Sequence, residues 1–191
     1  HIWRQSYVNI SAQFRHATGQ DLRAGLKVLA EVEVTFHELY GYSLHVVDID
    51  PTYTLGDLAA QRQAIIRQLE ADGVINLNKE IPLPRLIRHV AVISSATAAG
   101  YGDFCRQLEQ SGYGFEVQLF PAVMQGDGVE QSVIAALDRI ATKTDRWDVV
   151  VIIRGGGSSL DLHGFDTYLL AANVAQFPLP VVVGIGHERD V

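Results

Sequence analysis

The sequence predicts an α/β protein in which a mostly parallel, doubly wound sheet follows a partial antiparallel β segment. Short apolar runs recur after residue 89 and alternate with amphipathic stretches of helical period, a pattern typical of strands joined by helices. The first 50 residues instead alternate apolar with polar side chains, which favours strands exposed on one face. A chain of 191 residues with 48% apolar composition is also long enough to bury a full core.

Residues 1–53 are the predicted antiparallel segment. They hold few helix signals, and we expect strands over residues 27–35 and 42–49 with a turn at residues 38–41. A meander of two or three strands is marginal by itself in water. We therefore expect this segment to be part of a small barrel whose earlier strands are missing.

Residues 54–88 are predicted to connect this segment to the next domain. Apolar side chains at helical spacing predict a helix over residues 55–71, and Gly73 supplies a stop signal. Pro82 and Pro84 cannot continue a helix, so residues 76–85 are expected to form an extended linker.

Residues 89–191 are the predicted α/β domain. Its expected strands cover residues 89–94, 114–120, 147–153 and 180–185, and its expected helices cover residues 101–111, 128–143 and 165–176. Asp127 and Glu130 stand at capping positions of the second helix. Right-handed crossovers then give a mostly parallel sheet, and ligands of such sheets lie outside the carboxyl ends of the strands.

Composition limits the functions that this chain could have. The formal net charge of −7 argues against a broad nucleic-acid-binding surface, so a phosphate site must be a focused cleft. The chain contains no long apolar run typical of a membrane span and no signal-peptide pattern, which predicts a cytoplasmic protein with no membrane contact. Cys105 is the single cysteine, so an internal disulfide is excluded, and we expect it to be a small buried filler.

The most informative motif follows the third predicted strand of the α/β domain. Here Arg154 is followed by Gly155, Gly156, Gly157 and Ser158. Glycines let successive backbone N–H groups point at one oxyanion, and an arginine adds a forked, permanent charge, so the motif predicts a phosphate-binding loop. The alternative is that the glycines only relieve a tight turn. The motif matches neither the P-loop nor the dinucleotide fingerprint, and no lysine follows it, which disfavours a nucleoside-triphosphate site.

Three further side chains are candidates at the same edge. His187 follows the last strand, where a group that titrates near neutrality can transfer protons, and Asp190 either orients its ring or caps a helix. Asp103 lies near the start of its predicted helix and either stabilises the helix dipole or joins the site. The remaining histidines and acids that we considered are interpreted as solvated: His16, His37, His45, Asp48, Asp50 and His89.

From about residue 26 to its end, the chain resembles the large subunit of bacterial exodeoxyribonuclease VII. The start of this stretch resembles the tail of that family's N-terminal OB-fold, and the resemblance continues through KEIPLP at residues 79–84 and HVAVISS at 89–95. PAVMQG at 121–126, RGGGS at 154–158 and GHERD at 186–190 complete the series. Agreement across so many separate loops is more specific than any single motif.

This resemblance implies an exonuclease that hydrolyses phosphodiester bonds of single-stranded DNA from either end and releases oligonucleotides. It places the family's essential residues on Asp103, Arg154, His187 and Asp190. It also implies that the chain ends before the helical region through which the family binds a small subunit. No cofactor is required on this basis, because the family works without added divalent metal, while Mg²⁺ stays open with Asp103 and Asp190 as candidate ligands.

The sequence also departs from the family pattern in places. Ala96 stands where many members have proline, and residues 159–163 read SLDLH where Leu-Glu-Asp-Leu-Trp is common. The missing glutamate weakens a metal-ligand role for that loop, although Asp161 matches. The alternative function is a non-catalytic α/β module that binds a small phosphorylated ligand at the same edge.

Overall fold

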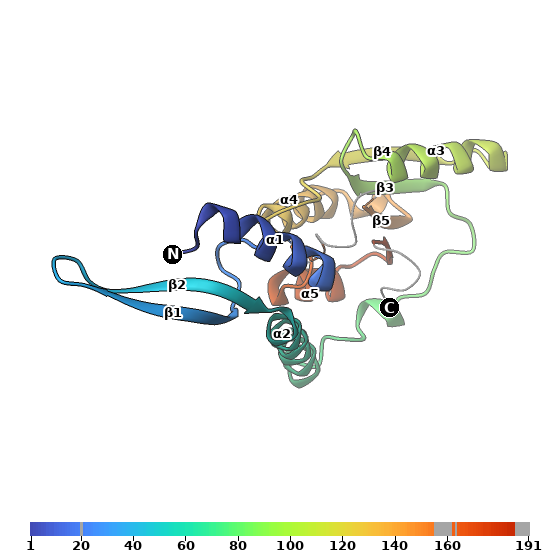
Figure 1. Cartoon of the computed structure of the whole chain (residues 1–191). Coiled ribbons are helices and arrows are strands. Elements are labelled where there is room, and N and C mark those ends of the chain that lie inside the picture. The colour runs from blue at the N-terminus through green and yellow to red at the C-terminus, as the bar shows by residue number, and fades with distance from the viewer. Residues whose placement is uncertain (20, 155–161, 163, 186–191) are drawn as a thin grey trace. The chain divides into compact units, whose positions relative to one another are not determined.

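A computed structural model describes residues 1–19, 21–154, 162 and 164–185, and the chain divides into two compact units (Figure 1). Unit 1 comprises His1–Gln63 and unit 2 comprises Ala64–Val191. The division falls within helix α2 (Pro51–Ala71), so one helix contributes residues to both units. The domain boundaries expected from the sequence, after residues 53 and 88, stay a prediction.

Unit 1 contains a helix, α1 (Arg4–Thr18), that the sequence did not predict. Helix signals are indeed few, since α1 has no capping side chain at Trp3 and no acidic residue in its first turn, but the expectation that this segment forms only strands was wrong. Its helical pattern depends on Ile10 and Phe14, which lie one turn apart and are buried against Ile49. Packing on one narrow face therefore stabilises this helix.

The other part of unit 1 is an antiparallel hairpin of β1 (Leu29–His37) and β2 (Gly41–Asp50), which confirms the two expected strands and their turn. Gly41 has a φ of 72°, the left-handed conformation that glycine adopts without strain at such a turn. His45 is half-buried rather than solvated, because its ring stacks on Trp3 at 5.5 Å and its Nε2 lies 3.0 Å from Thr35 Oγ1.

Helix α2 begins at Pro51, four residues before its expected start. Asp50 accepts hydrogen bonds from the hydroxyl and the backbone N–H of Thr52, and these bonds lower the pKa of the Asp50 carboxyl below its ordinary value. Proline at the first position of a helix loses no internal hydrogen bond there. The linker that follows contains one turn of 3₁₀ helix, η1 (Asn78–Glu80), where we expected only extended chain.

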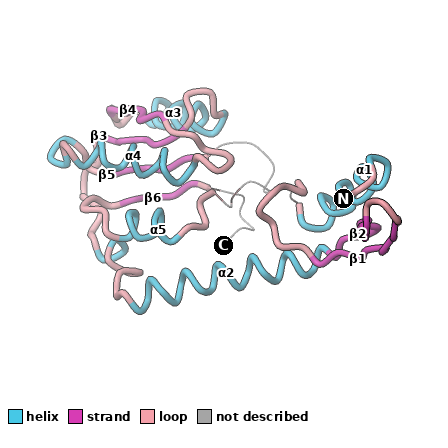
Figure 2. Tube along the Cα trace, turned by 90° about the vertical axis from the view of Figure 1, so that its left-hand side faces the viewer, coloured by secondary structure: helices cyan, strands magenta, loops and turns pink. Residues whose placement is uncertain are grey.

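Unit 2 confirms the predicted parallel α/β fold. Its sheet has the order β4-β3-β5-β6, and every neighbouring pair is parallel (Figure 2). The strands are β3 (His89–Ser94), β4 (Glu116–Pro121), β5 (Val149–Ile153) and β6 (Val181–Gly184). The helices are α3 (Ala99–Ser111), α4 (Val129–Ala141) and α5 (Tyr168–Ala175). No helix in the described ranges is both long and apolar enough to cross a membrane.

The central strands are apolar at successive positions because both faces of the sheet are covered. Val90 and Val92 of β3 pack on the face where Tyr101 and Phe104 of α3 lie, together with Val149, Val151 and Ile153 of β5. Ala91 and Ile93 point to the opposite face, into a second core that α4 and α5 share. Strands that are buried on both faces need this continuous apolar pattern, which is why the sequence reveals them.

Asn78 of η1 fixes the entrance of β6. Its amide nitrogen donates to the carbonyls of Phe177 and Leu179 at 3.0 and 2.9 Å, and its side-chain oxygen accepts from the Val181 N–H at 2.9 Å. The three bonds join segments about a hundred residues apart within unit 2. They satisfy backbone groups at the edge of the sheet that the strand ladder does not reach.

We expect Asn78→Ala to lower the free energy of unfolding by about 2 kcal/mol, because three partly buried backbone groups lose their partner. Urea denaturation would measure the change. Asn173→Ala is the matched control, since Asn173 is exposed and bonds only within α5 to Leu169, and it should cost less than about 0.5 kcal/mol. Equal effects of the two substitutions would contradict this role of Asn78.

Asp148 performs a similar task at the amino end of the sheet. Its Oδ2 accepts the backbone N–H groups of Arg88 and His89 at 2.7 and 2.8 Å, and it lies 3.4 Å from His89 Nδ1. His89 is half-buried and lies next to this carboxylate, whereas we expected it to be a solvated residue. The bond from the His89 N–H, followed by that from Arg88, lowers the pKa of the Asp148 carboxyl below its ordinary value of 3.8.

A carboxyl whose pKa is lowered by folding stabilises the protein above its unfolded pKa, and this contribution is lost as pH falls through the folded value. The Asp148 contribution is therefore present at neutral pH and is lost at pH values below about 4. We expect Asp148→Asn to remove part of the loss of stability in acid. Thermal unfolding between pH 7 and pH 2 would test this, and parallel pH profiles of the wild type and the variant would refute it.

Candidate functional site

The carboxyl ends of the four strands are brought level by the register of the sheet. Ser94 stands opposite Pro121, and Ile153 stands opposite Gly184. Three hydrogen bonds continue this alignment past the strand ends. The buried Ser94 hydroxyl donates to the Ile153 carbonyl at 2.7 Å, the Ala122 N–H donates to the Ser94 carbonyl at 3.0 Å, and the Arg154 N–H donates to the Gly184 carbonyl at 3.1 Å.

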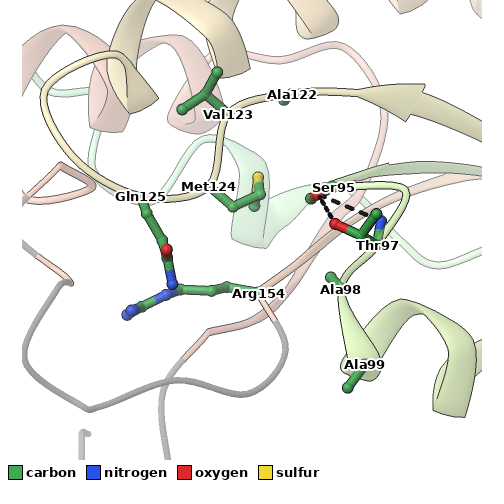
Figure 3. Close-up of a pocket in the computed structure, with 9 residues that line it drawn as sticks. All are labelled: Ser95, Thr97, Ala98, Ala99, Ala122, Val123, Met124, Gln125 and Arg154. Atoms are coloured by element: carbon green, nitrogen blue, oxygen red, sulfur yellow. Dashed lines mark hydrogen bonds between the residues drawn. The ribbon is translucent and has the colours of Figure 1, made fainter.

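A cavity of about 560 Å³ opens at this edge (Figure 3). Two loops and one strand end form its walls: the loop from β3 into α3, the loop after β4, and Arg154 after β5. Of the nine described residues that line the cavity, Arg154 alone is charged: the others are Ser95, Thr97, Ala98, Ala99, Ala122, Val123, Met124 and Gln125. The sequence prediction that Arg154 lies at a pocket on the carboxyl edge is thus met by the geometry. A single cation among small neutral side chains favours an anionic ligand.

The loop after β4 is held in place from several sides. Arg139 of α4 donates to the Pro121 carbonyl at 3.0 Å, and the Val123 N–H donates to the Ser132 hydroxyl at 2.8 Å. Gly164 packs so closely against this loop that an added Cβ would lie 2.8 Å from the Gly126 carbonyl oxygen. This wall of the cavity is therefore built in advance of any ligand.

Asp103 does not line the cavity. It lies in the second turn of α3, because this helix begins at Ala99, two residues before its expected start. The alternative interpretation, an acid in the first turn that stabilises the helix dipole, is therefore wrong. Asp103 is four residues after the cavity residue Ala99 and so shares its face of the helix. Its exposed carboxylate pairs with Arg106 at 3.2 Å, an arrangement that holds a surface carboxylate only weakly.

The other predicted site residues, Gly155, Gly156, Gly157, Ser158, His187 and Asp190, lie outside the described residues. Within the described ranges no three His, Cys, Asp or Glu side chains gather in a metal-binding arrangement. Of the two candidate metal ligands only Asp103 is described, and its carboxylate is paired with Arg106. The assignment of catalytic, phosphate-binding and metal-binding roles therefore stays a prediction.

Several residues at this edge have no role that was predicted from the sequence: Ser94, Ser95, Thr97, Met124 and Gln125. A signal was present, since each of them ends a predicted strand or follows one at the carboxyl edge. Short polar side chains in loops are common, however, and nothing in the sequence separates those that face a cavity from those that face solvent.

Comparison with known proteins adds an independent observation. A sequence model of the family described as "Exonuclease VII, large subunit" matches residues 74–191. The exodeoxyribonuclease 7 large subunit of Deinococcus radiodurans is 40% identical over 99% of this chain. The proteins of the same name from Moorella thermoacetica and Shouchella clausii are 37% and 34% identical over 89% and 87% of it. The chain spans only 47%, 42% and 36% of the length of these three relatives, respectively.

Ser94→Ala removes the hydroxyl that holds the Ile153 carbonyl in a fully buried setting. We expect a loss of about 1 to 3 kcal/mol in the free energy of unfolding, because a buried acceptor is left without its partner. Chemical denaturation would measure this loss. Ser111→Ala is the control, since the exposed Ser111 hydroxyl makes only local bonds, donating to the Leu108 carbonyl and accepting from the Tyr113 N–H at 3.4 Å. A Ser94 variant as stable as this control would exclude the proposed role.

Proposed function

Because this chain belongs to the exonuclease VII large-subunit family, we propose that unit 2 carries the catalytic site of an exonuclease that hydrolyses phosphodiester bonds in single-stranded DNA and releases oligonucleotides. The observation that supports this most directly is Arg154, the one charged residue among the described residues lining the cavity at the carboxyl edge of the sheet. A phosphodiester is an anion of suitable charge for this guanidinium.

The position of β6 also supports the proposal. The Gly184 carbonyl accepts a hydrogen bond from the Arg154 N–H, so the end of β6 is adjacent to the arginine that would bind phosphate. Two residues lie between Gly184 and His187, so the Cα atoms of these two residues are at most about 11 Å apart. This limit is compatible with the proposed role of His187 at a phosphate near Arg154.

In the proposed reaction a water oxygen forms a bond to phosphorus while the bond from phosphorus to the leaving oxygen breaks. His187 accepts a proton from the water and donates a proton to the leaving oxygen, and Asp190 orients the His187 ring. Arg154 and the backbone amides from Gly155 to Ser158 offset the negative charge that develops on the phosphate oxygens. Asp103 lies on the same face of α3 as the cavity residue Ala99, and it aligns the water or holds a cation.

Further expectations follow from family membership. We propose that the full protein acts on single-stranded DNA together with the family's small subunit. We also propose a cytoplasmic location, as expected from the sequence. The described part of the chain supports the phosphate site alone, so substrate and partner need direct tests.

The alternative is a non-catalytic α/β module that binds a small phosphorylated ligand in the same cavity. Arg154 and the small neutral lining would serve such a ligand equally well. What favours hydrolysis is the match of the family model over residues 74–191, which includes the His187 and Asp190 positions that a simple binding module would not need. The two functions differ in one measurable respect, which is whether a bound oligonucleotide is cut.

We expect the full-length protein, assembled with its small subunit, to shorten an end-labelled single-stranded oligonucleotide both in EDTA and with Mg²⁺. His187→Ala should lower the cleavage rate at least about a hundredfold, because a positioned proton-transfer group contributes that much or more. Binding of the oligonucleotide should be retained. Gel electrophoresis of the products and fluorescence anisotropy would measure the two quantities.

His16→Ala is the control variant, since His16 is exposed on α1 and has no proposed role. A wild-type protein that binds the oligonucleotide and leaves it intact would favour the binding module. Normal turnover by His187→Ala would remove the proposed role of the histidine while leaving the nuclease function in place.

A further inference from the structure

The cavity beside Arg154 is larger and more apolar than a phosphate group needs. Its volume of about 560 Å³ falls within the range of sites that hold whole small molecules, roughly 300 to 1,000 Å³. Ala98, Ala122 and Val123 contribute apolar surface, and Met124 is buried at its base with only 5% of its surface exposed. A phosphate bound by Arg154 would leave this apolar part empty.

Gln125 completes the cavity on the side of Arg154. Its side chain extends from the loop after β4 towards the arginine (Figure 3), and it is exposed to any ligand that enters. Gly126, with a φ of 74°, turns the chain directly after it. The bonds from Arg139 to the Pro121 carbonyl and from the Val123 N–H to Ser132 hold the loop before the glutamine, and Gly164 packs against Gly126 after it, so the backbone at Gln125 is fixed in advance.

The chemistry of these residues fits a nucleobase. A carboxamide offers one acceptor and two donor hydrogens, and rotation of the amide matches it to the edges of different bases. Small apolar side chains of the cavity wall, such as Ala122 and Val123, accept the flat face of an aromatic ring. An arginine at the same opening would hold the adjoining phosphate.

We propose that this cavity is a nucleotide subsite, in which the base next to the phosphate held by Arg154 enters between the two loops and Gln125 hydrogen-bonds to its edge. The inference rests on the proposed nuclease function, since it assigns the cavity to the substrate of that site. It adds a part of the substrate that the phosphate-binding role of Arg154 does not explain. Because the amide adapts to different bases, the contact improves binding without selecting a sequence.

The test compares Gln125→Leu with the wild type on an ordinary single-stranded oligonucleotide and on a matched abasic oligonucleotide, using the full-length protein with its small subunit. Leucine keeps the size of the side chain and removes its hydrogen bonds. On the ordinary substrate we expect kcat/KM to fall about tenfold, mainly through KM, which corresponds to the loss of one good hydrogen bond. On the abasic substrate the variant should differ from the wild type by less than about twofold, because the contacted base is missing.

Gln107→Leu is the matched control, since Gln107 is an exposed residue of α3 and does not line the cavity. It should leave kcat/KM unchanged on both substrates. An equal loss for Gln125→Leu on both substrates would show that the residue acts on the protein and not on a base, which overturns the proposal.

Failure of the proposed function is recognised separately. If the wild type cleaves neither substrate, the nuclease proposal fails, and the same four combinations are compared by oligonucleotide binding. Equal affinities of the wild type and Gln125→Leu for the ordinary oligonucleotide would then exclude the subsite as well. If the wild type cleaves and Gln125→Leu matches it on the ordinary substrate, the subsite is excluded while the nuclease function stands.

Discussion

The hydrogen bond from the Ser94 hydroxyl to the Ile153 carbonyl aligns the ends of two strands, and the rest of the site depends on this alignment. Parallel strands send all their following loops to one edge, but the loops meet only if the strands end at the same level. Ser94 secures this for β3 and β5 by donating to the Ile153 carbonyl, immediately before Arg154. The Arg154 N–H then donates to Gly184, so the backbone at this arginine is fixed from two neighbouring strands. Because its backbone is held in this way, Arg154 needs little rearrangement of the main chain to bind an anion.

The same constraint explains which parts of the structure could be predicted. Each residue of β5 is buried, because both faces of the sheet are covered. The continuous apolar run at residues 149–153 therefore predicts a strand from the sequence alone. Its end marks the edge where Arg154 lies. Helix α1 gave no such signal, because its start lacks a capping side chain and only Ile10 and Phe14 are buried along it. The predicted start of α3 was also wrong by two residues. Asp103 therefore lies in the second turn of the helix and not in the first, which excludes the helix-dipole interpretation.

Side chains that line the cavity were harder to predict for a different reason. Gln125 and Thr97 follow strands whose positions the sequence revealed, yet their direction depends on hydrogen bonds made by distant residues, such as that from Arg139 to Pro121. His89 and His45 show the same limit, since their neighbours Asp148 and Trp3 come from other elements. The sequence thus locates an edge of the sheet, and tertiary contacts decide which side chains converge on it.

Net charge and local charge lead to opposite expectations for a phosphate ligand. The acidic net charge disfavours its binding, whereas Arg154 at the cavity favours it. A formal charge of −7 repels polyanions at long range, and at physiological ionic strength that repulsion is screened beyond roughly 8 Å. Within the cavity, the described lining brings one guanidinium and no carboxylate. Arg154 is half-buried, and a partly buried charge is screened less than an exposed one. The acidic composition of the chain is therefore compatible with the proposed phosphate site at Arg154.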